Sequence, residues 1–331
     1  MRILYAIQGT GNGHVSRARD VVPCLQQHGE VDLLISGTQS DVQLSWPIKY
    51  RFYGLSFIFG QHGSVSISAT LRRLRPFRFL RDLWRLPVHD YDLIITDFEP
   101  VSAWACKLRG KKCYAMSHQA AFLSPKTPRP DYIHDRFAEL ILRRYAPVND
   151  HIGFHFEAYD QKITTPVVRE EVRQLQVTNT GQIVVYLPAY ADAVLLQHFH
   201  QLPEIRWFLF SKHTKTAYQQ GNVQVMPINN AAYLQQLGSC AGLLTGGGFE
   251  APAEALFLGK KIMTVPMKGQ YEQHANAVAA ARLGACVVRE IGPAFSTQLR
   301  TWLLLPAPVA QNFPNNTQEV VDRAIKKWCT S

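Results

Sequence analysis

The chain reads Gly246-Gly247-Gly248-Phe249-Glu250 in its last third, with Glu254 four residues further on. An apolar run that ends at Thr245 precedes the glycines, and a helix is expected from about Glu250, so the stretch is typical of a turn between a strand and a helix. Backbone N–H groups at the start of a helix bind phosphate, and the Glu254 carboxylate can reach a ribose. The pattern predicts an α/β domain with a nucleotide site at the carboxyl end of a strand.

A second polar segment follows the next expected strand, residues 261–265. It reads PMKGQYEQ over residues 266–273 and leads into a helix expected over 273–283. Its amide and carboxylate side chains can bond sugar hydroxyls, and Asn276 can fix the loop. The alternative is a glycine turn and a polar loop without a ligand. The residues predicted to bind this ligand are Thr245, Gly246, Gly247, Gly248, Phe249, Glu250, Glu254, Gln270, Glu272, Gln273 and Asn276.

Another glycine-rich turn, GTGNGH over residues 9–14, follows an apolar strand over 2–8 and precedes a helix over 15–28. The N–H groups of this turn can bind an anion. Its third glycine comes one residue too early for the G-x-G-x-x-G pattern, and no acid follows the next apolar run, residues 31–36, so a nicotinamide site is disfavoured. A tight turn without a ligand is the alternative. We predict that Gly11, Asn12 and Gly13 contact a second substrate.

His14 ends this turn at the start of the helix. The positive end of the helix dipole disfavours a protonated imidazole, so a neutral His14 can accept a proton as a general base. The alternative is that His14 merely caps or lines the turn. His118, at the end of the strand expected over 112–117, is a weaker candidate of the same kind and is predicted to contact the second substrate.

Two acids follow the strand expected over 91–96. Asp97 lies at its carboxyl end and Glu99 comes two residues later. Ligands of parallel sheets bind beyond these strand ends, and an acid there can orient a histidine and stabilise its charged form. An N-cap role for Asp97 in the helix expected over 102–108 is the alternative. We predict that His14 and Asp97 form the catalytic pair and that Glu99 contacts the second substrate.

Length and periodicity predict two domains, since a single core rarely extends beyond ~250–300 residues. Strand–helix–strand units recur in both halves of the 331 residues, as in parallel sheets. The order of elements over residues 37–90 is not evident. We expect the division within 155–180, with domains at 1–165 and 166–305 and a crossover plus a final helix at 306–331. The strands expected in the second half are 182–187, 207–210, 223–226, 242–245 and 261–265, and its helices include 231–237 and 250–257.

Composition narrows the class of protein. Hydrophobic residues make up 47% and charged residues 18%, as in ordinary globular proteins. The first residues are apolar for too short a stretch to be a signal peptide, and no apolar run approaches the ~20 residues of a transmembrane helix, so we expect a soluble, cytoplasmic protein. The six cysteines are scattered without a C-x-x-C pair, which indicates reduced thiols. The net charge of +10 suggests an anionic partner.

A basic, aromatic stretch, LRRLRPFRFLRDLWRLP, occupies residues 71–87. After Pro76 its arginines share one helical stripe with aromatic and leucine residues beside it, which is typical of an element on an anionic membrane surface. The main alternative is a solvated helix that packs its apolar side on the domain. Arginine also suits the phosphates of an acceptor. No nucleic acid is expected, because no recognised motif accompanies the charge.

The run G-G-G-x5-E-A-L-x-x-G-K-x5-P, followed by Q-Y-E-Q-x-x-N-A and Leu283-Gly284-Ala285, resembles the donor-binding signature of GT-B glycosyltransferases. This family holds UDP-glucuronosyltransferase-like enzymes and the lipid-linked N-acetylglucosaminyltransferase of peptidoglycan synthesis. The chain looks most like uncharacterised bacterial and archaeal members with a G-Q-Y-E-Q loop. Those also carry a G-x-G-x-G-H-type opening and a T-D-F-E-P strand end, as at Thr96–Pro100.

The resemblance implies two Rossmann-like domains that face each other across a cleft, with the last helix returning to the first domain. It implies a UDP-sugar donor in the second domain: Glu254 matches the ribose-binding acid, Gly247 and Gly248 the diphosphate glycines, and Glu272 with Gln273 the pair that contacts the sugar. His14 matches the base of many relatives. Gly246 stands where many relatives have a histidine.

The expected activity is inverting transfer of a hexose-type sugar to an acceptor hydroxyl, without a metal or other cofactor. The expected place is the inner membrane surface, as a step in making a cell-envelope glycan. The acceptor class, whether lipid-linked, glycan or small molecule, stays open. Two alternatives remain. One is an enzyme like UDP-N-acetylglucosamine 2-epimerase, which needs no acceptor. The other is a non-catalytic subunit that binds a nucleotide-sugar.

Overall fold

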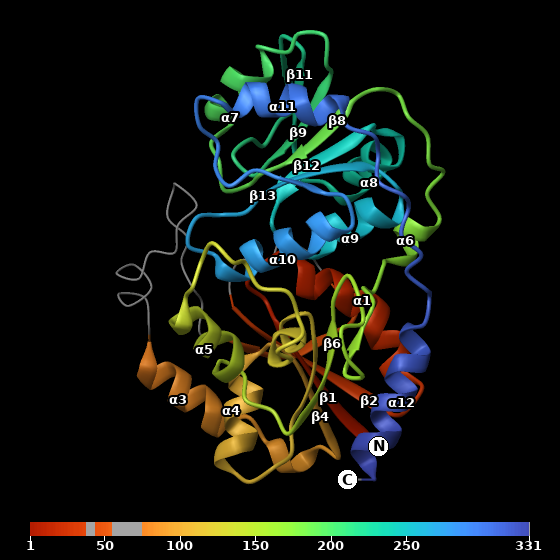
Figure 1. Ribbon diagram of the computed structural model, residues 1–331. Coiled ribbons are helices and arrows are strands. Elements are labelled where there is room, and N and C mark those ends of the chain that lie inside the picture. Colours follow the sequence, from red (N-terminus) through yellow and green to blue (C-terminus); the bar gives the residue numbers. More distant parts are fainter. Residues whose placement is uncertain (38–43, 55–74, 331) are drawn as a thin grey trace.

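The computed structural model describes residues 1–37, 44–54 and 75–330, and it consists of two α/β halves, one above the other in Figure 1. The lower half contains a sheet in the order β3-β2-β1-β4-β5-β6-β7, in which every pairing is parallel. Its strands are β1 Arg2–Gln8, β2 Glu30–Ser36, β3 Ile48–Phe52, β4 Leu93–Asp97, β5 Tyr114–Ser117, β6 Asp150–Phe154 and β7 Ile163–Thr164.

The upper half contains a second sheet, in the order β10-β11-β9-β8-β12-β13-β14. It is parallel except for the β10–β11 pair. The strands expected from sequence in both halves are therefore confirmed. Those of the upper half are β8 Ile183–Tyr186, β9 Trp207–Ser211, β10 Tyr218–Gln220, β11 Val223–Pro227, β12 Gly242–Gly246, β13 Lys261–Val265 and β14 Cys286–Val287.

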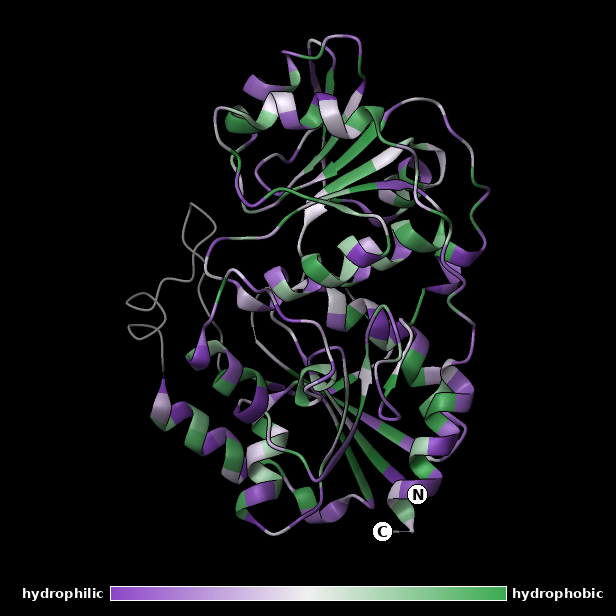
Figure 2. Cartoon of the chain, in the orientation of Figure 1, coloured by the Kyte–Doolittle hydropathy of each residue, from purple (hydrophilic) through white to green (hydrophobic). Residues whose placement is uncertain are grey.

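Helices cover both sheets and leave the strands as the most apolar layer (Figure 2). The α-helices of the lower half are α1 Asn12–Gln26, α3 Pro76–Arg85, α4 Pro100–Leu108 and α5 Arg136–Arg144, with 3-10 turns η1 Val88–Asp90 and η2 Gln119–Leu123. The remaining α-helices are α6 Glu170–Arg173, α7 Asp192–Phe199, α8 Asn230–Ser239, α9 Glu250–Phe257, α10 Tyr271–Arg282, α11 Phe295–Leu304 and α12 Thr317–Cys329. None of the helices in the described ranges combines the length and apolarity needed to cross a bilayer.

The last helix, α12, returns to the lower half as predicted. Its Trp328 ring stacks on Tyr114 of β5 with centroids 4.8 Å apart, and Asp322 pairs with His28, just after α1, at 2.7 Å. Figure 1 shows α12 beside α1 and β2, with both chain ends nearby. The fold class expected from the resemblance, two Rossmann-like halves with a returning helix, is thereby confirmed. The exact domain ranges stay a prediction.

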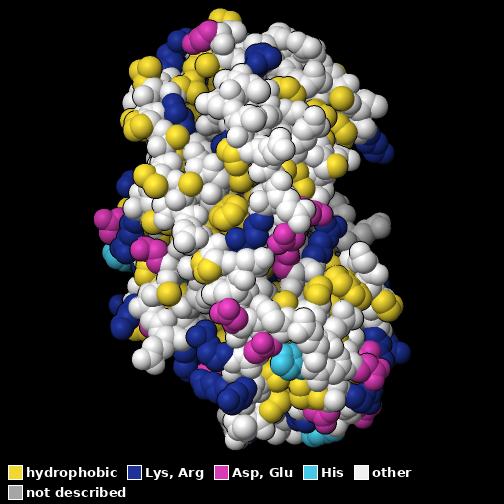
Figure 3. Space-filling view, turned by 90° about the vertical axis from the view of Figure 1, so that its right-hand side faces the viewer, with side chains coloured by type: hydrophobic (Ala, Val, Ile, Leu, Met, Phe, Trp, Pro, Cys, Tyr) yellow, Lys and Arg dark blue, Asp and Glu magenta, His cyan; other side chains and the backbone are white. Residues whose placement is uncertain are grey.

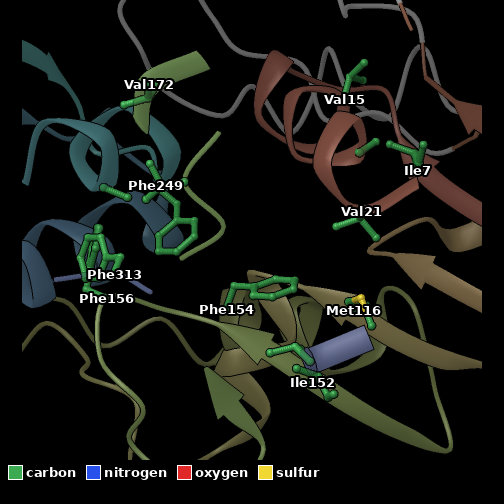
Figure 4. Packing of buried hydrophobic residues seen from close by; sticks show 14 of the residues in the cluster. Ile7, Val15, Val21, Met116, Ile152, Phe154, Phe156, Val172, Phe249 and Phe313 are labelled. Carbon is green, nitrogen blue, oxygen red and sulfur yellow. The ribbon is translucent and has the colours of Figure 1, made fainter. Parts of the chain in front are cut away.

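A continuous apolar cluster joins the two halves. Phe154 and Phe156 of the lower half and Phe249 of the upper half belong to it (Figure 4), and the rings of Phe156 and Phe249 lie 5.0 Å apart. The turn before α9 is therefore anchored by an aromatic residue that is 4% exposed. This packing holds the glycines of that turn opposite the glycines that precede α1.

Helix starts differ from the expected positions because of their caps. The helix expected at 15–28 begins at Asn12, since Gly11 takes φ 101° and ψ 161°, a conformation open to glycine alone. The helix expected at 102–108 begins at Pro100, because the Glu99 carboxylate accepts the N–H groups of Val101 and Ser102 at 2.7 and 2.6 Å. The helix expected at 273–283 begins two residues early, at Tyr271.

Candidate active site

A cavity of about 1330 Å³ lies between the two halves. Both glycine turns and the polar segment before α10 line it, so three segments far apart in sequence meet there as the sequence predicts. The predicted site residues on its walls are Gly11, Asn12, Gly13, His14, His118, Thr245, Gly246, Gly248, Phe249, Glu250, Glu254, Gln270, Glu272 and Gln273. The other four, Asp97, Glu99, Gly247 and Asn276, lie behind its walls.

The predicted pair is formed. His14 Nδ1 lies 2.8 Å from Asp97 Oδ1, and Asp97 is fully buried at the end of β4. Burial alone would raise the pKa of Asp97, but the Arg17 guanidinium and the His14 imidazole hold that pKa below its ordinary value. An ionised Asp97 accepts a hydrogen bond from the Nδ1–H group, so in the neutral ring Nε2 of His14 is the unprotonated nitrogen. The geometry is that of an oriented general base.

Arg17 completes this group, and the sequence analysis did not single it out. Its guanidinium donates to both oxygens of Asp97, at 2.8 and 2.9 Å, and its other terminal nitrogen donates to Glu250 at 2.7 Å. Arg17 is only 2% exposed. One signal was available: Arg17 follows His14 by three residues on the buried stripe of α1, where a charge requires a buried partner.

Glu99, predicted to contact the second substrate, does not reach the cavity. It is fully buried, and both carboxylate oxygens are used to cap α4. The N-cap role that was the alternative for Asp97 therefore belongs to Glu99. The physical reason is the left-handed Phe98 (φ 57°), which turns the chain between the two acids so that Asp97 faces α1 and Glu99 faces α4.

His118 lines the cavity but differs from His14 in its partners. Its ring is 1% exposed and stacks on Phe249 with centroids 3.9 Å apart. Nδ1 lies 2.8 Å from the Phe154 carbonyl, and Nε2 lies 2.8 Å from Asn276 Oδ1. Burial lowers the pKa of His118 to about 4, so the ring is neutral at pH 7. Both partners are acceptors and a neutral ring carries one N–H, so His118 donates to only one of them at a time. Its contacts reach both halves, and neither ring nitrogen is without a protein contact.

The three glycines before α9 have different surroundings. A Cβ on Gly247 would lie 2.4 Å from the Gln273 carbonyl, whereas one on Gly248 would meet nothing within 4 Å. A Cβ on Gly246 would make only ordinary contacts, the nearest being Gln273 Oε1 at 3.7 Å. Gly247 is therefore required by packing. Gly246 and Gly248 leave open space against the cavity, and the position at which many relatives have a histidine has room for a side chain.

Two predicted ligand-binding residues brace this turn. Gln273 Oε1 accepts the N–H groups of Gly247 at 3.3 Å and of Met267 at 2.9 Å. Asn276 Nδ2 donates to the Gly247 carbonyl at 3.2 Å from its buried position. Asn276 thus fixes the turn from behind, the role considered for it in the sequence, and does not reach the cavity.

Glu254 is 4% exposed and is held by Arg169, a second residue that the sequence analysis missed. Arg169 NH2 donates to Glu254 Oε2 at 3.0 Å and its Nε donates to Oε1 at 2.5 Å, while NH1 reaches Asn230 at 2.8 Å. Burial raises the pKa of Glu254 and Arg169 opposes that rise. Glu254 and Arg169 both line the cavity. No sequence signal marks Arg169, since it precedes a four-residue helix between the two sheets.

Glu272 faces His14 across the cavity through Gln119. Gln119 Nε2 donates to Glu272 Oε1 at 2.9 Å and lies 3.4 Å from His14 Nε2. Burial raises the pKa of Glu272 to about 7. The amide of Gln119 is the third contribution that the sequence analysis missed, because a lone glutamine after a strand carries no distinctive pattern.

Charged side chains also gather at the level where the halves meet (Figure 3). Arg19 of α1 pairs with Glu171 of α6 at 3.8 Å, and Arg169 lies 3.6 Å from the same glutamate. The segment between the two sheets is thus tied to α1 by ion pairs. The partly exposed pair of Arg19 with Glu171 contributes little stability.

Structures with the same fold are known. MurG from Acinetobacter baumannii is 17% identical, with 98% of this chain and 99% of that chain covered and a TM-score of 0.61. SnogD from Streptomyces nogalater is 13% identical over 99% of both chains, at a TM-score of 0.55. UGT89C1 from Arabidopsis thaliana, complexed with UDP, is 12% identical over 98% and 94% of the two chains, at 0.60. These likenesses show the fold.

A search of curated proteins found no match. The sequence model of the family described as Glycosyl transferase family 1 matches residues 1–294, which is most of the chain. The chain therefore belongs to glycosyl transferase family 1 and has the GT-B fold of its glycosyltransferases.

Proposed function

We propose that the protein transfers a hexose-type sugar from a UDP-sugar to an acceptor hydroxyl, with inversion at the sugar carbon. One observation carries the proposal: an oriented base, His14, and two bare glycines of the second turn, Gly246 and Gly248, line the same cavity from opposite halves. A base on one wall and a phosphate site on the other suit an attack on a sugar held between them.

The acceptor oxygen forms a bond to the anomeric carbon of the sugar and gives its proton to His14 Nε2. The bond from that carbon to the diphosphate oxygen breaks, and its electron pair leaves with UDP. Asp97 stabilises the imidazolium that forms. The N–H groups at the start of α9, whose N-cap residue Phe249 provides no side-chain cap, face the departing charge.

Two relatives support a nucleoside diphosphate as the ligand. The Arabidopsis structure was solved with UDP and the structure of VinC with DTDP. In this chain the Glu254 carboxylate, held by Arg169, is the proposed partner of the ribose hydroxyls, and Gln270, Glu272 and Gln273 are the proposed partners of the sugar. A carboxylate retains acceptor capacity beside one arginine, because it has about four lone-pair sites.

Helix ends and backbone N–H groups can neutralise a diphosphate without a metal. We therefore propose metal-independent transfer. The measurement is the rate of UDP release with EDTA and with added Mg²⁺ or Mn²⁺. Equal rates are expected, and a rate that EDTA abolishes would contradict this part of the proposal.

The donor assignment is tested by isothermal titration with UDP and a panel of UDP-sugars. Wild type is expected to bind, and Glu254→Gln to bind at least tenfold more weakly, since a hydrogen bond to a charged group is worth about 1.5–3 kcal/mol. The surface variant Asp322→Asn is the matched control. Absence of UDP binding to wild type, or equal binding by Glu254→Gln, would overturn the assignment.

The reaction class is tested by UDP release with lipid, glycan and small-molecule acceptors. A UDP-sugar that changes in NMR spectra without any acceptor would favour the 2-epimerase alternative. Binding of UDP with no release on any acceptor, and no effect of His14→Ala, would favour the non-catalytic subunit. Release that requires an acceptor and His14 supports transfer.

We also propose that α3 rests on an anionic membrane surface. Residues 71–74 of the basic stretch lie outside the described residues, but α3 is described from Pro76. Its Phe77, Leu80 and Trp84 side chains are 86%, 49% and 73% exposed. The helix instead packs on the domain through Leu83, which is buried in the cluster beside α4. The alternative of a helix that packs its apolar side inward does not hold for these three residues.

Arginines surround this exposed apolar strip. Arg75, Arg81 and Arg85 are exposed, and each basic residue near an anionic leaflet contributes about 1 kcal/mol. Sedimentation with vesicles of phosphatidylglycerol and phosphatidylcholine is the test. We expect binding that needs the anionic lipid, falls with salt and is lost in Trp84→Ser with Arg81→Ser. Binding indifferent to lipid charge and salt would contradict the membrane surface.

A further inference from the structure

We infer that Arg17 is a positioning residue that sets which nitrogen of His14 carries the proton and that joins this base to the donor-binding turn through Glu250. The inference deepens the proposed function, because the role of His14 as a base belongs to that proposal. It rests on the contacts of Arg17, which is buried between α1, β4 and α9.

The hydrogen bonds of Arg17 and Asp97 determine which nitrogen of His14 is protonated. A guanidinium only donates, and the Arg17 guanidinium bonds both oxygens of Asp97. An Asp97 held in its ionised form can only accept from His14 Nδ1 at 2.8 Å. Nδ1 must then be the protonated nitrogen, and the lone pair is on Nε2. Arg17 NH2 also lies 3.2 Å from Nδ1, where its positive charge opposes a second proton on the ring.

Arg17 also joins the two halves through its second carboxylate partner. Asp97 belongs to the lower half, whereas Glu250 is the first residue of α9 and directly follows the glycine turn. Arg17 NH1 bonds Glu250 Oε1 at 2.7 Å. Gly13 permits the approach, since a Cβ there would lie 2.4 Å from the Glu250 carboxylate. The same arginine thus contacts the acid that orients the base and the start of the helix that faces the donor.

The charges around His14 determine the sign of each test. Asp97 contacts its ring from β4, Arg17 lies on its own helix, and Glu250 bonds Arg17 from α9. Glu272 of α10 faces His14 through Gln119. His118, on the same wall as Gln119, is neutral at pH 7. Removal of the Arg17 charge should favour protonation of His14, and removal of the Glu250 charge should disfavour it.

The test is the titration of His14 in the full-length protein without substrate, followed by NMR of ¹⁵N-labelled histidine rings and assigned by the loss of one signal in His14→Gln. In wild type we expect Nδ1 protonated and Nε2 bare. We expect the titration midpoint to rise by about one pH unit in Arg17→Met and less in Arg17→Lys. In Glu250→Gln we expect it to fall. Asp322→Asn, which removes a remote ion pair near the end of α1, should leave it unchanged.

A purely structural role predicts none of these opposite shifts. If Arg17→Met does not fold, as judged by its melting curve, Arg17→Lys and Glu250→Gln still decide, because they must move the midpoint in opposite directions. Shifts of the same sign, no shift in either variant, or a wild-type ring protonated at Nε2 would overturn the inference. The measurement needs no sugar transfer, so the inference can fail while the proposed function holds. Once an acceptor is known, the acid limb of the kcat–pH profile should move to higher pH in Arg17→Lys, and a pH-independent loss would count against it.

Discussion

The two glycine turns share one strand–turn–helix arrangement but differ in the groups that they present to the cavity. Each comes after a parallel strand, β1 or β12, and precedes a helix, α1 or α9, whose first N–H groups lack a side-chain cap. After the first turn, α1 places His14 and Arg17 against Asp97. In the second turn, Gly246 and Gly248 leave open space against the cavity. In the proposed mechanism, one strand–turn–helix unit positions the base, and the other leaves backbone N–H groups bare for the donor.

The largest expected effect is the loss of transfer activity on removal of His14, which follows the first turn. His14→Ala should lower the rate of transfer by about 10²–10⁴-fold, because general base catalysis contributes that much, and should leave UDP affinity within a factor of about two. Initial rates of UDP release and isothermal titration measure the two quantities. His89→Ala, on an exposed turn far from the cavity, is the control. If His14→Ala lowered the rate and the UDP affinity equally, the two turns would not have separate roles in catalysis and donor binding.

The next effect concerns the buried pair behind the second turn. Arg169→Met should lower the free energy of unfolding by about 3 kcal/mol, because it leaves Glu254 buried without its partner. The double variant Arg169→Met with Glu254→Gln should recover part of this loss. Urea unfolding of the single and double variants gives both values. An Arg169→Met variant as stable as wild type would show that the pair is not formed.

The glycines of the second turn provide an internal comparison. Gly247→Ala should destabilise the protein by about 1–3 kcal/mol, because its Cβ would lie 2.4 Å from the Gln273 carbonyl. Gly248→Ala should leave the melting temperature nearly unchanged and weaken UDP binding about tenfold by filling the open space. Thermal melts and UDP titrations of both variants are the measurement. A Gly248→Ala variant that loses stability but binds UDP normally, with a stable Gly247→Ala variant, would contradict a phosphate site at Gly248.

The smallest expected effect is a pH dependence at the polar segment. The pKa of Glu272 is raised to about 7 from an ordinary 4.5, so between these pH values the folded protein binds more protons than the unfolded chain. Its contribution therefore makes the free energy of unfolding fall as pH rises from about 4.5 to about 7, by about 2 kcal/mol. Urea unfolding of wild type and Glu272→Gln at pH 5 and pH 8 tests this. The Glu272→Gln variant should not show this fall, and parallel pH profiles of the two proteins would contradict a raised pKa of Glu272.

The sequence predicts the fold well because apolar strands, glycine turns and helix stripes are local features. It also brings His14 and Asp97 together, since the carboxyl ends of neighbouring parallel strands meet at one edge. It does not separate the roles of Asp97 and Glu99, which depend on the left-handed Phe98 between them. A pattern of residue types shows no such backbone rotation.

The contacts between the halves cannot be predicted from the sequence, for a different reason. Arg17, Gln119 and Arg169 act through partners that lie 233, 153 and 85 residues away. Their pairing depends on how one half packs on the other, and no local pattern encodes that packing. Likewise, the three adjacent glycines look equivalent in sequence, and only the position of Gln273 shows that Gly247 is required by packing.

The assignment of the donor to the second turn is the central claim, and hydrogen–deuterium exchange with and without UDP tests it most directly. The account predicts that UDP protects peptides covering Thr245–Glu254 and residues 266–273 most strongly, with smaller changes over residues 9–17 where α1 contacts Glu250. Strong protection confined to residues 9–17, with none at the second turn, would contradict it.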